Sequence, residues 1–558
     1  MNDLTGGDSR LERLLDAMSP RDKAAQLFVL PVHGDAAHAA DPRNRAWYGV
    51  DRPADLVARH RPGGIVYFGG EHGNLRHPRQ IAALSDGLQR AARDAGTLPL
   101  LLATDQEGGA VTRLPRPATR TPGAMALAAA RDAAAVRDLA LLTARELRAV
   151  GVTHAYAPVA DVNACAANPV IGVRSFGSDP RLAAVLTAAH VEGSQAGGVA
   201  ATAKHFPGHG DTAVDSHTGV PVITHDRDTW ERLDLPPLRA ALDAGVASVM
   251  TGHLVVPALD PAGLPATLSR PVITGLLRDT LGFDGVVVTD ALDMRGVRAR
   301  FGDDRVAVLA LKAGVDLLLK PPAGRFLTQL EAVLAAVRSG ELTEERLHAS
   351  ARRVLRLKHR LGLLDDPFTD PAALARVGAP EHLAAARRAA DRAVTLLTDR
   401  DRLLPLPPDA RDLLVTGCGA AALGAELDRR VPATVVETGP DPAPGRVAGA
   451  VAAARGRDLV VAVTDRAWDT RTRPGQAALV TALNATGAPL VVVAVGDPYD
   501  IARFPGVPAF LATYSRTTEA LRAAAATLTG HNIPRGRLPV TIPGPDGREL
   551  YAFGHPDV

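Results

Sequence analysis

Eight short apolar runs alternate with helical patterns along the first part of the chain, and this alternation limits the possible folds more than any other feature. The runs are Gln26–Val32, Gly64–Phe68, Leu100–Thr104, Thr153–Pro158, Gly198–Ala203, Ala247–Thr251, Gly285–Thr289 and Gly314–Leu319. Between them lie helix patterns such as Arg79–Ala95, Ala124–Val150, Pro180–Ala196 and Arg270–Leu281. Strands that alternate with helices become parallel through right-handed crossovers. Eight such units predict a TIM-like (β/α)8 barrel, with a doubly wound open sheet as the alternative.

Polar residues follow several of these runs directly. Asp105 ends the third run, Lys204 and His205 the fifth, His253 the sixth and Asp290 the seventh. In a barrel, the carboxyl ends of the strands surround one mouth, where the functional site lies. The sequence therefore predicts that these side chains converge on a common site.

The densest polar stretch is KHFPGHGDTAVDSH, residues 204–217. Pro207, Gly208 and Gly210 break the strand and begin a loop. Within fourteen residues the stretch holds a cation, three imidazoles and two carboxylates. Such groups are costly to bury, and their clustering marks a site.

Asp215 and His217 lie two residues apart in this loop. A carboxylate that accepts a hydrogen bond from an imidazole Nδ1–H fixes the tautomer and raises its basicity, leaving the other nitrogen for proton transfer. Asp290 directly follows an apolar strand. No Ser–His or Cys–His nucleophile pair is evident, so a carboxylate is the best nucleophile candidate. One carboxylate nucleophile and one proton-transfer group are the machinery of retaining glycoside hydrolysis.

Two other kinds of site are weaker interpretations. His205, His209 and His217 with Asp215 suit zinc, but Pro207 and Gly208 keep the first two histidines off a shared helix face, so we expect no metal and no cofactor. The segment 417–424 (GCGAAALG), with Glu437 ending the next strand, imitates a dinucleotide site. Its spacing is not GxGxxG, so we expect a tight strand–helix turn.

The remainder of the chain predicts a second domain. Residues 11–26 read as helix with a new turn at Ser19-Pro20, and Glu344–Leu361 reads as the barrel's closing helix. Residues 365–380 are rich in proline and aspartate and read as linker, followed by a helix, Glu381–Ala393. Strand-like runs then recur at Leu413–Thr416, Ala433–Glu437, Leu459–Thr464, Leu490–Val495 and Ala509–Thr513. We expect a barrel at 1–364, a linker and connecting helix at 365–392, and an α/β/α sandwich of five or six strands at 393–558.

Composition argues against several classes of partner. The net charge is +2, with basic and acidic residues interleaved, whereas a nucleic-acid protein usually shows a one-sided basic stripe. The two cysteines, Cys165 and Cys418, fall in different predicted domains and offer no disulfide framework. The N-terminus is polar, and no apolar run approaches the ~20 residues of a membrane span. We expect a cytoplasmic protein without nucleic-acid or membrane partners, with an atypical export route as the alternative; the oligomeric state is left open.

Four stretches together resemble the NagZ-type β-N-acetylglucosaminidases of glycoside hydrolase family 3. They are DQEGGAVTRL (105–114), APVADVNACAANPVIGVRSFGSDP (157–180), KHFPGHGDTAVDSH (204–217) and LGFDGVVVTDALDM (281–294). HNIPRGRLPVTIP (531–543) is similar to the closing motif of the family's second domain. The chain departs from the pattern at Ala110, where many relatives carry arginine, and in having the second domain, which short members lack.

The resemblance implies roles for individual residues. Asp290 is implied as nucleophile, His217 as acid/base and Asp215 as its partner. The residues implied to surround the non-reducing sugar are Asp105, Arg113, Arg174, Lys204 and His205.

The implied function is removal of terminal β-linked N-acetylglucosamine from cell-wall muropeptides or chitin fragments, a small carbohydrate substrate. A phosphorylase is one alternative, because a histidine acid/base, unlike a glutamate, does not repel phosphate. A broad-specificity β-glucosidase/hexosaminidase and a non-catalytic sugar-binding protein are the others.

Overall fold

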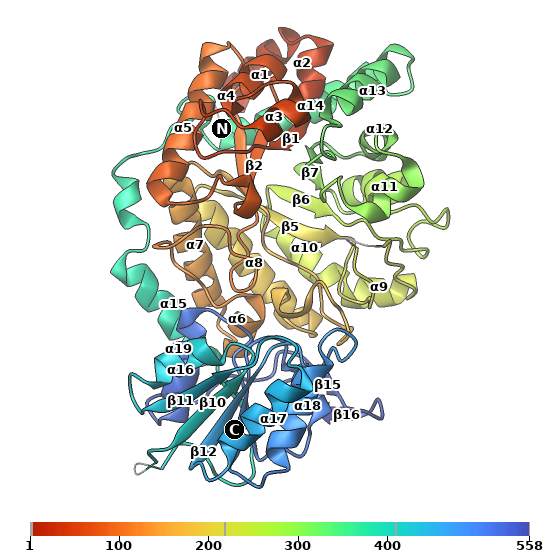
Figure 1. The fold of residues 1–558 in the computed structure, drawn as a ribbon. Coiled ribbons are helices and arrows are strands. Elements are labelled where there is room, and N and C mark those ends of the chain that lie inside the picture. Colours follow the sequence, from red (N-terminus) through yellow and green to blue (C-terminus); the bar gives the residue numbers. More distant parts are fainter. Residues whose placement is uncertain (1–3, 217–218, 408–409, 557–558) are drawn as a thin grey trace.

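The computed structural model describes residues 4–216, 219–407 and 410–556. Two sheets organise them (Figure 1). The first has eight strands in the order β7-β6-β5-β4-β3-β2-β1-β8. They are β1 (Phe28–Pro31), β2 (Gly64–Tyr67), β3 (Leu101–Thr104), β4 (His154–Ala155), β5 (Ala200–Phe206), β6 (Ser248–Thr251), β7 (Val286–Thr289) and β8 (Leu318–Leu319).

All eight predicted strands are confirmed, and their pairing is parallel throughout. A further parallel bridge between Val288 and Leu317 joins the two ends of the sheet. The sheet thus curls into a nearly closed barrel, and the open-sheet alternative was wrong. Every residue of the eight strands is buried, because helices cover the outside and side chains fill the interior.

The helices of the barrel follow the predicted alternation. They are α1 (Leu4–Asp16), α2 (Pro20–Ala25), α3 (Pro42–Tyr48), α4 (Pro53–His60), α5 (Pro78–Asp94), α6 (Ala124–Ala130), α7 (Ala133–Ala149), α8 (Pro180–Ala196), α9 (Arg227–Leu233), α10 (Leu235–Asp243), the π-helix η4 (Pro271–Thr280), α11 (Arg295–Phe301), α12 (Arg305–Ala313), α13 (Phe326–Arg338) and α14 (Glu344–Arg360). Among the residues described, no helix has the length and apolar character needed to cross a bilayer.

The predicted helix Ala124–Val150 was wrong in one respect, because it is two helices. Arg131 adopts φ 51° and ends α6, and the Asp132 side chain accepts a hydrogen bond from Ala135 N to begin α7. Met125 and Ala126 of α6 are buried within the core of the second domain. The break therefore turns α6 toward that domain.

The second domain is built on a six-stranded sheet in the order β11-β10-β12-β13-β14-β9. Its elements are α15 (Pro380–Ala393), β9 (Thr395–Asp399), β10 (Leu413–Gly417), α16 (Ala420–Leu427), β11 (Ala433–Glu437), α17 (Pro444–Ala454), β12 (Leu459–Thr464), α18 (Pro474–Asn484), β13 (Leu490–Ala494), β14 (Ala509–Ala512), α19 (Thr518–Leu528), β15 (Ile542–Pro543) and β16 (Glu549–Tyr551). The five predicted strands are present. Strand β9, antiparallel to β14, was not predicted because it follows α15 without a turn signal.

The linker runs along the side of the barrel and reaches α15 near α6 (Figure 1). It holds a short 3₁₀ turn, η5 (Ala373–Arg376). Two cores flank the second sheet, and one of them includes residues of α6. The two domains are thus packed against each other through α6.

Candidate functional site

A cavity of about 370 Å³ opens at the carboxyl ends of the barrel strands. Six of the eight predicted site residues line it, namely Asp105, Arg113, Arg174, Lys204, His205 and Asp290. Ser216 also lines it, so the loop after β5 reaches the same cavity. The predicted convergence on one mouth is therefore observed for these six residues.

A buried ion cluster forms one wall of the cavity. Lys204 Nζ lies 2.9 Å from an Asp105 oxygen and 2.6 Å from a Glu107 oxygen. Arg174 holds Glu107 with a two-pronged contact, Nε and Nη2 each donating at 2.8 Å. The Lys204 and Glu107 side chains are only 2% and 4% exposed. Such charges are retained in a dry wall because each meets an opposite partner.

Charge pairing favours the ionised forms of Glu107 and Lys204. Burial alone would raise the pKa of Glu107, but Arg174 and Lys204 outweigh it and hold that pKa well below the ordinary value. Burial would lower the pKa of Lys204, yet Asp105 and Glu107 raise it. The wall therefore offers fixed donors and acceptors, which suit sugar hydroxyls.

Strand β5 is longer than predicted and carries Lys204 and His205 within its last three residues. Its pairing with β6 shifts register between Lys204 and Phe206, so His205 is skipped in the ladder. Such a bulge re-aims the side chains beside it. Both Lys204 and His205 thereby reach the cavity.

Asp161 organises the turn that follows. Its Oδ2 lies 2.7 Å from His205 Nδ1, and its Oδ1 accepts from the backbone N–H groups of His205 and His209 at 3.1 and 2.8 Å. Burial opposes ionisation of Asp161, but His205 and His209 together outweigh it, so the pKa of this carboxyl is lowered. The carboxylate fixes Nδ1 as the donating nitrogen and leaves His205 Nε2 for the cavity.

Asp290 follows β7 directly. One carboxylate oxygen accepts a 2.7 Å hydrogen bond from Ala291 N, and the other makes no hydrogen bond to any described residue. Burial would raise the pKa of Asp290, but His205, His253, the Ala291 N–H and Lys204 together lower it. This side chain is therefore an ionised carboxylate at the cavity, and one of its oxygens has no hydrogen-bond partner among the described residues.

His253 was expected at the mouth but supports it from behind. It is fully buried, with Nδ1 2.9 Å from Thr267 Oγ1 and Nε2 3.0 Å from the Ala291 carbonyl oxygen. It does not line the cavity. Its contact with Ala291 braces the residue next to Asp290.

The loop after β5 holds the other two predicted catalytic residues. Asp215 is half-buried there, one residue before Ser216 at the cavity. His217 lies outside the described residues, so the expected Asp215–His217 pairing remains a prediction. In the same region, His225 Nε2 lies 2.8 Å from Asp234, which the sequence did not indicate.

The sequence analysis missed several residues that line or support the site. Glu107 stands two residues after Asp105 in the quoted DQEGG motif and was open to notice. Lys320 follows the eighth run, lies 2.8 Å from Asp293, and sits 4.8 Å from the centre of the Phe68 ring. Asp161 gave no local signal, because its role comes from contacts with residues more than forty positions away.

The glycine-rich segment after β10 is a turn, as expected. The Glu437 side chain accepts from the backbone N–H groups of Gly419 and Ala421, each at 3.0 Å. These N–H groups begin α16, where a dinucleotide phosphate would otherwise bind. The protein's own carboxylate occupies that position.

The barrel mouth places fixed hydrogen-bond donors and acceptors beside the Asp290 carboxylate, an arrangement of the kind found in enzymes that act on polyhydroxylated ligands. Family models agree with this class. The model for the glycosyl hydrolase family 3 N-terminal domain matches residues 21–357, and that for the C-terminal domain matches residues 394–555. The chain belongs to glycosyl hydrolase family 3.

Individual relatives give the same family. Beta-hexosaminidase A of Pseudoalteromonas piscicida is 36% identical over 384 residues, 64% of this chain and 63% of that protein. A beta-N-acetylglucosaminidase/beta-glucosidase of Cellulomonas fimi is 35% identical over 328 residues, 56% of this chain and 57% of that protein. The matches thus span less than two thirds of these two relatives.

A solved structure covers nearly the whole chain. It is a family 3 beta-N-acetylglucosaminidase from Paenibacillus sp. strain FPU-7, with a TM-score of 0.85 and 38% identity. The likeness covers 94% of this chain and 99% of that one. The two-domain arrangement is therefore shared with that protein.

Proposed function

We propose that the protein is a retaining, exo-acting glycoside hydrolase that removes terminal β-linked N-acetylglucosamine from cell-wall fragments or chitooligosaccharides. The observation that carries the proposal is the ionised Asp290, which lines the same cavity as the Lys204–Glu107–Arg174 cluster and has one oxygen that no described residue bonds. An anomeric carbon placed there meets a nucleophile, and its hydroxyls meet fixed donors and acceptors. The names of the relatives support N-acetylglucosamine as the sugar.

The proposed reaction has two steps. In the first, Asp290 forms a bond to the anomeric carbon, the bond to the aglycone oxygen breaks, and His217 gives its proton to that oxygen. In the second, His217 takes a proton from water, the water oxygen attacks the anomeric carbon, and Asp290 leaves. Asp215 orients His217 in both steps.

Trapping of the intermediate tests the nucleophile. Incubation with a 5-fluoro glycosyl donor should add one sugar to the protein, and peptide mass spectrometry should place it on Asp290. Asp290→Ala should lose the label and essentially all turnover. Asp293→Ala is the matched control, since Asp293 lines the same cavity and should leave the label in place. A label on any other carboxylate contradicts the assignment.

Leaving-group dependence tests the acid/base. General acid–base help is worth about 10²–10⁴-fold, and an aryl oxygen of low pKa leaves without it. His217→Ala should therefore nearly abolish disaccharide cleavage but impair glycosyl transfer from a nitrophenyl donor far less. Azide, which needs no base, should restore turnover and give the β-glycosyl azide. Equal slowing of both substrates without azide rescue would remove His217 from the mechanism.

A further inference from the structure

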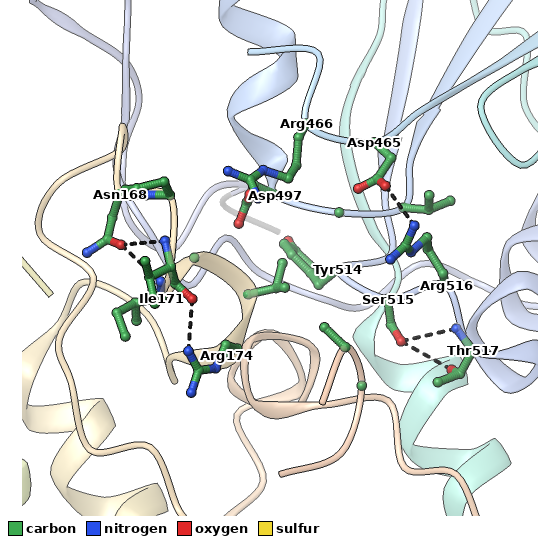
Figure 2. A pocket seen from close by; sticks show the side chains of 18 of the residues that line it. Asn168, Ile171, Arg174, Asp465, Arg466, Asp497, Tyr514, Ser515, Arg516 and Thr517 are labelled. Atoms are coloured by element: carbon green, nitrogen blue, oxygen red, sulfur yellow. Dashed lines mark hydrogen bonds and ion pairs between the residues drawn. The ribbon is translucent and has the colours of Figure 1, made fainter. Parts of the chain in front are cut away.

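An arginine-rich cavity of about 470 Å³ lies where the two domains meet. The barrel contributes the loop after β3 and the segment 168–174 (Figure 2). The second domain contributes the residues that follow β12, β13 and β14. In open α/β sheets, ligands bind outside the carboxyl ends of the strands, so this wall uses the edge of the sheet suited to binding.

The lining carries an excess of positive charge. Two aspartates, Asp465 and Asp497, face six arginines, which are Arg116, Arg120, Arg174, Arg466, Arg473 and Arg516. Three of these arginines are already paired. Arg174 is held by Glu107, and Arg473 and Arg516 share Asp465 at 3.3 and 2.9 Å.

The other three arginines have no ion pair with any residue in the described part of the chain. Among the described residues, Arg116 donates only to Thr518 Oγ1, at 2.7 Å. Arg120 Nε and Arg466 Nε are both buried, and neither has a hydrogen-bond partner among the described residues. Buried donors without acceptors are unfavourable, so a ligand that accepts from them would be stabilised. Burial raises the pKa of Asp497, although its hydrogen bond from Trp468 and the charge of Arg466 oppose the shift.

The local structure holds the Arg466 guanidinium in place. Its Cζ lies over the Trp468 ring, 5.4 Å from the ring centre, which is a cation–π contact. Arg466 adopts φ 62° and Tyr514, also in the lining, φ 57°. Residues other than glycine rarely adopt this left-handed backbone conformation, and those that do cluster at active sites and ligand clamps.

The arginine cavity adjoins the barrel cavity that holds Asp290. Val170 and Arg174 line both. A ligand longer than one sugar can therefore extend from the nucleophile toward the second domain, which places the aglycone beside the three unpaired arginines.

We propose that the interdomain cavity binds an oxyanion through Arg116, Arg120 and Arg466, either a carboxylate on the aglycone or free inorganic phosphate. Planar guanidinium groups suit both, because each offers parallel N–H donors to two oxygens. The carboxylate arm rests on the proposed hydrolase function. The second domain thus supplies selectivity for charged ligands while the barrel supplies the chemistry.

The first arm of the test compares two disaccharides of N-acetylglucosamine. One carries a lactyl ether carboxylate at O3 of the reducing sugar, and the other carries the corresponding lactyl amide. A hydrogen bond to a charged group predicts that kcat/KM for the acid exceeds that for the amide by roughly tenfold or more. Arg120→Gln and Arg466→Gln should each reduce this ratio by about tenfold. Arg116→Gln, at an exposed position, carries the same test if either half-buried variant, Arg120→Gln or Arg466→Gln, fails to fold.

The matched control is Arg471→Gln. Arg471 lies in the same loop as Arg466, and its substitution removes the same charge. Its side chain is 74% exposed and does not line the cavity. The ratio should not change. An equal fall in this control would assign the preference to general charge attraction and contradict the site.

The second arm titrates the free protein with inorganic phosphate in a calorimeter. Phosphate binding that disappears in Arg466→Gln, without an acid preference, supports the same site with a free anion as ligand. A ratio near one together with no phosphate binding overturns the inference. Hydrolysis of the amide disaccharide tests the proposed function separately, and if neither disaccharide is cleaved, the phosphate titration still decides the site.

Discussion

Glu107→Gln is the substitution that best tests the buried ion cluster. Glu107 receives three donors, two from Arg174 and one from Lys204, and its side chain is 4% exposed. Glutamine keeps the shape but loses the charge, and its amide N–H₂ faces a donor. Lys204 retains Asp105 at 2.9 Å, whereas the one other acceptor of Arg174 in the described part of the chain is the Val170 carbonyl oxygen.

The expected loss of stability follows from this geometry. Removing one partner of a buried pair costs about 3–5 kcal/mol, because the remaining charge is left uncompensated. The folded-state pKa of Glu107 is depressed below its ordinary 4.5, so its contribution is present above that pH and is lost as pH falls toward the folded-state value. The difference between wild type and variant should therefore be full at pH 7 and shrink below about pH 4.5.

Urea unfolding followed by tryptophan fluorescence measures the effect on the barrel. A Trp468→Phe background leaves Trp47 and Trp230, both in the barrel, as reporters. Glu341→Gln is the control, because Glu341 also binds two cations, Arg305 and Lys312, but on the surface. If Glu107→Gln unfolds like wild type, or no differently from Glu341→Gln, the cluster does not stabilise the barrel as argued.

Three further predictions concern other groups. Asp161→Asn should lower kcat/KM by on the order of tenfold or more, because the amide no longer fixes the His205 tautomer. A kcat/KM equal to that of wild type would contradict this. Dialysis against a strong chelator should leave full activity, and a loss restored specifically by zinc would show a metal role. Burial raises the pKa of Asp500 to about 7, so the free energy of unfolding of the second domain should fall as pH rises from about 4 to 7. Asp500→Asn should make that free energy, measured by Trp468 fluorescence, less dependent on pH.

Much of the fold could be predicted because its elements are local. All eight barrel strands were found from short apolar runs, and Asp105, Lys204, His205 and Asp290 were placed correctly at strand ends. The α6–α7 break was missed although Asp132 is a good N-cap residue, because the apolar pattern continues across it. Strand β9 was missed because only its pairing with β14 makes it a strand.

The site partners were harder to predict because they are distant in sequence. Lys204 and Asp105 lie 99 residues apart, and Arg174 and Glu107 lie 67 apart. The hydrophobic periodicity of a segment does not indicate which side chains at different strand ends will come into contact. His253 shows the same limit, since its position after β6 was right and its direction was not.

The sequence by itself determined the strands, the helices between them, and which chemical groups stand at strand ends, because burial imposes a period on each segment. Only the tertiary structure decided which charges pair and which remain free. Closure of the barrel brings Glu107 between Lys204 and Arg174, and packing of the second domain leaves Arg120 and Arg466 lining a shared cavity with no ion-pair partner among the described residues. These outcomes depend on long-range geometry, since the energy of a charge is set by the groups that folding places around it.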